Sequence, residues 1–106
     1  MNEHFNKLTP AEDERLSYLA EECSEVIKAC MKIQRHGYEI YNPDSIIHES
    51  NREILERELG DVILALNLMY ENKDISEKMI MKKAGHKSPC KYFHHQESFP
   101  TIEDLS

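Results

Sequence analysis

The chain has 106 residues, enough for one domain with a single modest hydrophobic core. Only three Gly and four Pro, together with abundant Leu, Ile, Met, Ala, Glu and Lys, favour an all-α fold over a β-sandwich or a linker. A formal net charge of -7 argues against nucleic acid as a partner, because proteins that bind nucleic-acid phosphates carry a basic face.

The N-terminus has no basic segment followed by an apolar one, and no stretch approaches the roughly 20 apolar residues of a membrane span. Cys23, Cys30 and Cys90 are odd in number and form no CxxC motif, which argues against a disulfide framework or a zinc site. We therefore expect a cytoplasmic protein with reduced thiols and no membrane partner. Cys23 and Cys30, one heptad apart on an apolar face, are expected to be core residues.

A first helix is predicted at about residues 10–36. Thr9 can cap its free amides, Pro10 suits the first helical position, and Glu12 can reach back to complete a capping box. Apolar residues then recur at steps of three and four until Gly37 ends the helix. They are Leu16, Leu19, Cys23, Val26, Cys30 and Ile33.

Turn-forming residues follow over 37–49, a connection with room for one short helical turn. Ser50 and Glu53 repeat the capping-box pattern and open a second helix at about 51–71. A third, shorter helix is expected at 74–84, and residues 96–106 read as a loose acidic C-terminal tail. For the third helix, Asp74 with Glu77 is the expected cap and Gly85 the expected end.

The second helix is apolar on nearly every side between Leu59 and Met69. A helix of this kind must be buried all round, which three helices of one chain can hardly achieve. The expected fold is therefore an all-α helical bundle completed by homo-oligomerisation, as a dimer or a tetramer.

Five carboxylates border these apolar faces. Glu21, Glu22 and Glu25 share one side of the first helix, while Glu58 and Asp61 lie one turn apart on the second. Burying such acids together is costly unless they are protonated, paired with cations or bound to a metal. Mg²⁺ is a hard ion that takes oxygen ligands and keeps water for a phosphate to replace, so these acids favour a Mg²⁺ site, with Mn²⁺ as a substitute.

The sequence Glu21-Glu22-Cys23-Ser24-Glu25 followed by Glu58-Leu59-Gly60-Asp61 resembles the EExxE and ExxD motifs of the MazG-like, all-α nucleoside triphosphate pyrophosphohydrolases. The resemblance covers both long helices, and the pair of motifs is more specific than either alone. It implies that Glu22, Glu25, Glu58 and Asp61 bind metal and that Glu21 orients or deprotonates water. It also implies hydrolysis of a common or modified (d)NTP to the monophosphate and pyrophosphate, in nucleotide-pool house-cleaning.

Positive side chains are expected to contact the phosphates of such a substrate, and Lys82 and Lys83 are the leading candidates. Many family members follow ExxD with a Lys, Asn and Arg arrangement, whereas this chain has no Arg after Arg57. Several aromatic residues could stack on a base or simply pack at helix ends. They are Tyr38, Tyr41, Tyr70, Tyr92 and Phe93.

Other interpretations remain open at this point. Glu21, Glu22 and Glu25 could form a solvated face paired with nearby lysines, and the lysines after residue 73 could serve solubility alone. A cluster of His86, Cys90, His94 and His95 lacks regular metal-ligand spacing. The alternative functions are a non-catalytic helical oligomerisation or adaptor module and, within the family, an enzyme like phosphoribosyl-ATP pyrophosphohydrolase. A di-iron bundle is disfavoured because neither long helix contains Glu-x-x-His.

Overall fold

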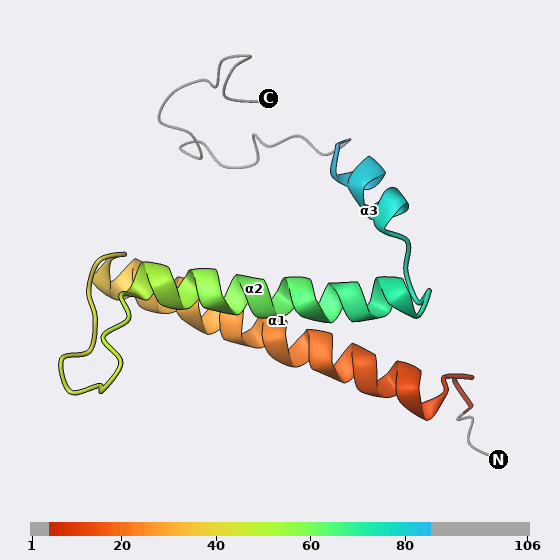
Figure 1. The fold of residues 1–106 in the computed structure, drawn as a ribbon, viewed down its shortest axis with the longest axis horizontal. Helices are drawn as coiled ribbons and strands as arrows, with labels where there is room; N and C mark the ends of the chain where they lie inside the picture. Colours follow the sequence, from red (N-terminus) through yellow and green to blue (C-terminus); the bar gives the residue numbers. More distant parts are fainter. Residues whose placement is uncertain (1–4, 86–106) are drawn as a thin grey trace. The chain divides into compact units, whose positions relative to one another are not determined.

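A computed structural model describes residues 5–85, and these contain three helices and no strand. The helices are α1 (Pro10–His36), α2 (Asn51–Glu71) and α3 (Glu77–Ala84), shown in Figure 1. The all-α prediction is confirmed. The chain divides after Ile75: α1, α2 and their connection belong to one unit, and α3 belongs to a second that begins at Ser76.

Both long helices begin at the capping boxes that the sequence contains. The Thr9 hydroxyl accepts from the backbone N–H of Glu12 at 3.1 Å, and the Glu12 carboxylate accepts from the N–H of Thr9 at 2.8 Å. Ser50 and Glu53 make the same reciprocal pair at the start of α2, with both bonds at 3.1 Å. These bonds satisfy amides that have no partner within the helix, so the sequence sets the starts of both helices.

The end of α1 also follows its sequence. Gly37 has a φ of 89°, and its N–H donates to the Ile33 carbonyl at 2.7 Å. The φ value lies in a region that side chains disfavour, which explains why glycine stands here. Residues 37–49 form turns and bends, and no helical turn appears among them.

The third helix starts later than expected. Ser76, rather than Asp74, is the N-cap of α3, and its hydroxyl accepts from the N–H of Met79 at 3.2 Å. Asp74 instead forms an ion pair within the first unit: its Oδ1 accepts from Nη2 of Arg15 at 2.9 Å. The predicted start at Asp74 is therefore wrong, because an ion pair to a residue far away in the sequence takes the carboxylate away from the helix end.

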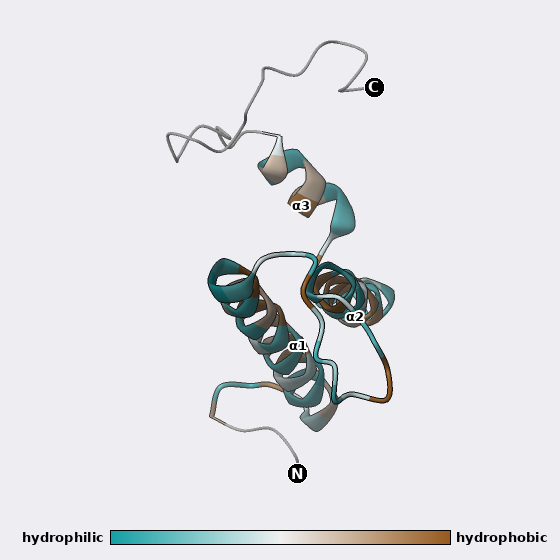
Figure 2. Cartoon of the chain, turned by 90° about the vertical axis from the view of Figure 1, so that its left-hand side faces the viewer, coloured by the Kyte–Doolittle hydropathy of each residue, from teal (hydrophilic) through white to brown (hydrophobic). Residues whose placement is uncertain are grey.

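The two long helices run side by side in opposite directions (Figure 1), and their shared core is small. Among the described residues, the buried apolar side chains are Ala29, Ala65 and Met69. Figure 2 shows apolar residues distributed around α2, and Leu59, Ile63 and Leu64 on this helix are exposed in the single chain. Within residues 5–85, no helix combines the length and the apolar character that crossing a membrane requires.

The two cysteines of α1 are exposed, so the prediction that they lie in the core is wrong for the single chain. The face that α1 turns towards α2 instead passes through Glu22, Val26, Ala29 and Ile33, all of which are buried or half-buried. Each cysteine follows one of these positions by one residue, which rotates it by about 100° around the helix. The packed face of α1 thus passes through Glu22 and not through Cys23.

Candidate metal centre

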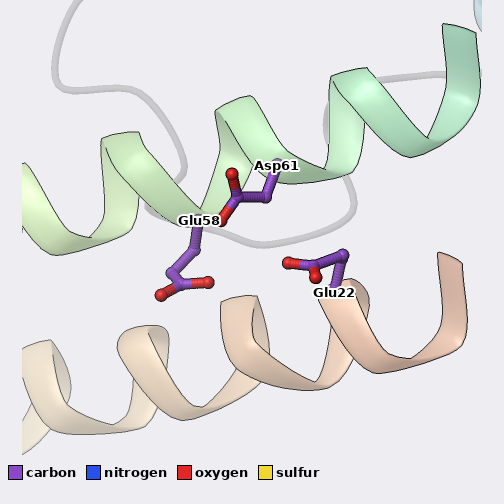
Figure 3. A group of neighbouring side chains, drawn as sticks. All are labelled: Glu22, Glu58 and Asp61. Atoms are coloured by element: carbon purple, nitrogen blue, oxygen red, sulfur yellow. The ribbon is translucent and has the colours of Figure 1, made fainter. Parts of the chain in front are cut away.

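Three carboxylates converge between the two long helices. Glu22 extends from α1, while Glu58 and Asp61 extend from α2 towards it (Figure 3). One carboxylate oxygen of each residue lies within 4.8 Å of those of the other two. Glu58 is 8% exposed, and Glu22 and Asp61 are half-buried. This is the part of the α1–α2 interface in which negative charge, rather than apolar surface, is concentrated.

Helix periodicity explains the convergence. Glu58 lies seven residues, or two turns, from both Asn51 and Ala65, and all three are buried on the face of α2 that meets α1. Asp61 follows Glu58 by one further turn on the same side. On α1, Glu22 precedes the buried Ala29 by seven residues. The acids therefore occupy positions at which an ordinary helix pair carries apolar side chains.

The environment of Glu22 disfavours its charged form. Burial raises the pKa of this carboxyl above its usual value, and the neighbouring charges of Asp61 and Glu58 raise it further, with smaller contributions from Glu25 and Glu21. Like charges held together in partial burial repel each other unless a cation or a proton is present. The cluster is therefore electrostatically incomplete.

The residues of the cluster fit a hard divalent cation. All three provide carboxylate oxygens, the donors that Mg²⁺ prefers. Ligands of an octahedral Mg²⁺ lie about 3 Å apart when adjacent and about 4 Å apart when opposite. The observed limit of 4.8 Å exceeds these separations only slightly, so small side-chain rotations would bring the three oxygens to one ion. Both the chemistry and the spacing suit Mg²⁺.

One cation at the edge of the cluster could not be assigned from the sequence. Arg57 donates from Nη1 to Oε1 of Glu58 at 2.9 Å and from Nε to Oε2 of Glu49 at 3.1 Å. The bond to Glu49, and then the charges of Glu49, Glu58 and Asp61, raise the pKa of the Arg57 guanidinium despite some burial. Its position next to Glu58 in the sequence was the available signal, but this did not indicate which way the side chain points.

The other two acids of the first motif lie outside the cluster. Glu25 forms an ion pair with Lys28 at 3.3 Å, and its side chain is 45% exposed. Glu21 is exposed on α1, and its backbone carbonyl accepts from the Ser24 hydroxyl at 2.6 Å. The structure thus brings together three of the five predicted site acids: Glu22, Glu58 and Asp61.

The predicted phosphate contacts lie on the separate unit. Lys82 and Lys83 are exposed in the last turn of α3. Several residues considered from the sequence lie outside the described part of the chain, as does the expected tail at 96–106. They are His86, Lys87, Cys90, Lys91, Tyr92, Phe93, His94 and His95.

Comparison with known proteins identifies the family. The family model described as "MazG nucleotide pyrophosphohydrolase domain" matches residues 11–92, well over half of the chain. No curated protein and no solved structure matches the chain. The matched region contains both acidic motifs, α2, α3 and all of α1 except its first residue. The chain therefore belongs to the MazG nucleotide pyrophosphohydrolase domain family.

Proposed function

We propose that this protein is a Mg²⁺-dependent nucleoside triphosphate pyrophosphohydrolase, which hydrolyses a common or modified (d)NTP to the (d)NMP and pyrophosphate. The observation that carries the proposal is the convergence of Glu22, Glu58 and Asp61 within a nucleotide pyrophosphohydrolase domain. An acidic cluster of this composition has little structural benefit without a cation. Removal of unwanted nucleotides from the cellular pool is the role that we assign to the reaction.

In this proposal, Glu22, Glu58 and Asp61 hold the metal ion, with Mn²⁺ as a substitute for Mg²⁺. Glu25 becomes a further ligand when its exposed ion pair with Lys28 opens. Exposed pairs of this kind contribute little free energy, about 0–1 kcal/mol, so exchanging Lys28 for a divalent cation is inexpensive. Glu22, Glu58 and Asp61 keep their positions because the helices that carry them are packed against each other.

When bound, Mg²⁺ would neutralise part of the triphosphate charge and lower the pKa of a coordinated water. Water attacks phosphorus, the anhydride bond between the α- and β-phosphates breaks, and pyrophosphate leaves. Glu21, exposed beside the cluster, accepts the proton released by the water. Lys82 and Lys83 contact the phosphate oxygens and balance the charge that develops on the leaving group.

We further propose that the protein acts as a homo-oligomer, a dimer or a tetramer. Support comes from the small core of the described unit and from the large apolar side chains that α1 and α2 leave exposed. Two of these are Ile27, at 63%, and Ile63, at 59%. Sedimentation of the wild type should give a dimer or larger species, and Ile63→Lys should shift it towards smaller, less stable species. A stable folded wild-type monomer at micromolar concentration would contradict this part of the proposal.

The activity is tested by pyrophosphate release from a panel of ribo- and deoxyribonucleoside triphosphates, each with Mg²⁺ and with EDTA. We expect release from at least one substrate that requires the metal. Absence of release from every member of the panel would instead favour the non-catalytic helical module or a specialised substrate such as phosphoribosyl-ATP, which is assayed separately.

A further inference from the structure

The connection between α1 and α2 and the adjoining helix ends line an open hollow that none of the proposed catalytic roles uses. It has a volume of about 540 Å³, and its lining comes from the end of α1, the connection and the first two turns of α2. We call it the loop hollow. Its size is within the usual range of small-molecule sites, about 300–1,000 Å³. The lining residues used below are Lys32, Ile40, Tyr41, Ile47, Asn51 and Arg57.

Backbone and side-chain bonds hold the walls of the loop hollow in place. The N–H of Asn51 donates to the Ile40 carbonyl at 2.8 Å, and its side-chain amide donates to the Gly37 carbonyl at 2.9 Å. Tyr41 forms an isolated antiparallel bridge with Ser50. The connection is therefore fastened to the start of α2 at Gly37, Ile40 and Tyr41, which holds this wall of the hollow in place.

The lining combines an aromatic ring, aliphatic side chains and an amide. The ring of Tyr41 is stacked against that of His48, with centroids 5.2 Å apart and planes inclined by 29°. His48 occupies one face of the ring, and Tyr41 as a whole is 48% exposed. Ile40 and Ile47 provide apolar surface, while Asn51 uses only one of its two N–H groups in its bond to Gly37. Such a lining suits a planar ring with polar edges.

A second hollow, of about 550 Å³, shares part of its lining with the loop hollow and extends to Glu58. The two hollows share Lys32, Ile54 and Arg57, and the second is also lined by Glu25 and Glu58. Lys28 and Arg35 add two further cations to its walls. In a chain with a net charge of -7, the lining of the second hollow carries more cations than acids, which suits a binding surface for phosphates.

We propose that the loop hollow is the nucleoside subsite of the enzyme, in which the base stacks on Tyr41 and its polar edge meets Asn51. The phosphates then extend past Lys32 and Arg57 to the carboxylate cluster. At 1.5 Å per residue, Asn51 lies about 10 Å from Glu58 along α2, comparable to the reach of a nucleotide from its phosphates to its base. This inference rests on the proposed function and adds to it the part of the chain that recognises the nucleoside.

The structure also provides a matched control within the same connection. The ring of Tyr38 lies under the guanidinium of Arg52, which is 4.3 Å from the ring centroid, and Tyr38 does not line the loop hollow. Tyr38 and Tyr41 are nearly equally exposed, at 47% and 48%. Replacing either one removes the same aromatic side chain from the same loop, so a difference between the two variants reports on the hollow itself.

The experiment compares Tyr41→Ala, Tyr41→Phe and Tyr38→Ala with the wild type. For each protein, KM and kcat are measured with the triphosphate that gives the highest wild-type kcat/KM, together with the inhibition constant of inorganic triphosphate. Stacking of a base contributes roughly 1–3 kcal/mol, so Tyr41→Ala should raise KM by about 5-fold to 150-fold and change kcat little. Inorganic triphosphate has no base, so its inhibition constant should stay unchanged. Tyr41→Phe and Tyr38→Ala should resemble the wild type.

Three results would overturn the inference while leaving the proposed function intact. The first is a KM that Tyr41→Ala leaves unchanged. The second is an inhibition constant of inorganic triphosphate that rises in parallel with KM, which would mean that Tyr41 supports the fold. Loss of the oligomer in Tyr41→Ala, measured by sedimentation, would instead assign the hollow to contact between copies. Failure of the proposed function is recognised separately, because the wild type would then hydrolyse no nucleotide, and the subsite would fall with it.

Discussion

Two half-buried carboxylates of the first unit have opposite surroundings. Asp74 receives two hydrogen bonds from Arg15, and these bonds hold its pKa below the usual value. Glu22 faces Glu58 and Asp61, and burial together with these charges raises its pKa. Asp74 thus finds its counter-charge within the chain, whereas Glu22 faces two further carboxylates, of which Glu58 is paired with Arg57. The ion pair of Asp74 with Arg15 stabilises the fold. The carboxylates around Glu22 repel each other, and binding of a metal ion would relieve this repulsion.

The largest expected difference between the two sites is in catalysis. Glu58→Ala or Asp61→Ala should lower kcat/KM by at least about 100-fold, because each change removes a carboxylate from the metal site. Asp74→Asn, which alters the other carboxylate, should keep activity within about threefold of the wild type. Pyrophosphate release measures the rates, and circular dichroism checks that helicity is retained. Activity that survives both cluster variants would remove the basis for the assigned site.

The pH dependence of stability without metal should reveal the repulsion at Glu22. A carboxyl whose folded pKa is raised contributes stability below its unfolded value, near 4.5, and this contribution is lost as the pH rises through the folded pKa. Glu22→Gln resembles the protonated form, so it should unfold at a higher temperature than the wild type at pH 8. The difference should shrink as the pH falls towards 4.5. Thermal unfolding in EDTA tests this; a variant less stable than the wild type at pH 8 would contradict it.

Replacing the Asp74 carboxylate by an amide should lower the unfolding temperature, the opposite of the change at Glu22, and this is the smallest effect that we expect. Its lowered pKa means that the charged carboxylate stabilises the fold above the unfolded value of 3.8 and loses this contribution as the pH falls through the folded pKa. Asp74→Asn should therefore lower the unfolding temperature by about 5 °C at pH 7, and by progressively less below pH 3.8. Asp44→Asn, in the exposed connection, is the control. Equal effects of the two substitutions would show that the ion pair with Arg15 has no special role.

The same contrast explains what the sequence could predict. Capping boxes and a terminal glycine are local signals, so the starts of both long helices and the end of α1 followed from the residues at Thr9, Ser50 and Gly37. The start of α3 did not, because Asp74 is engaged by a residue 59 positions away. A contact of this length is invisible to any local pattern.

For the site, motif spacing predicted the carboxylates that helix periodicity then placed on facing sides: Glu22, Glu58 and Asp61. Motif spacing did not distinguish these three acids from Glu21 and Glu25. Glu21 lies one residue before Glu22 and Glu25 three residues after it, and the packing of the two helices decides which of these side chains faces α2. The prediction that Cys23 and Cys30 lie in the core was wrong for the same reason. Arg57 was missed because a flexible cation beside a motif can pair in several directions.

The most direct test of the central claim is calorimetric titration of Mg²⁺ into the nucleotide-free protein, with Glu58→Gln and Asp74→Asn titrated under the same conditions. Both substitutions replace a carboxylate by an amide of the same shape, one in the cluster and one in the ion pair with Arg15. We expect the wild type and Asp74→Asn to bind Mg²⁺ with similar affinity, and Glu58→Gln to bind at least about 10-fold more weakly. Equal binding by all three proteins would show that the carboxylates between α1 and α2 are not the metal site.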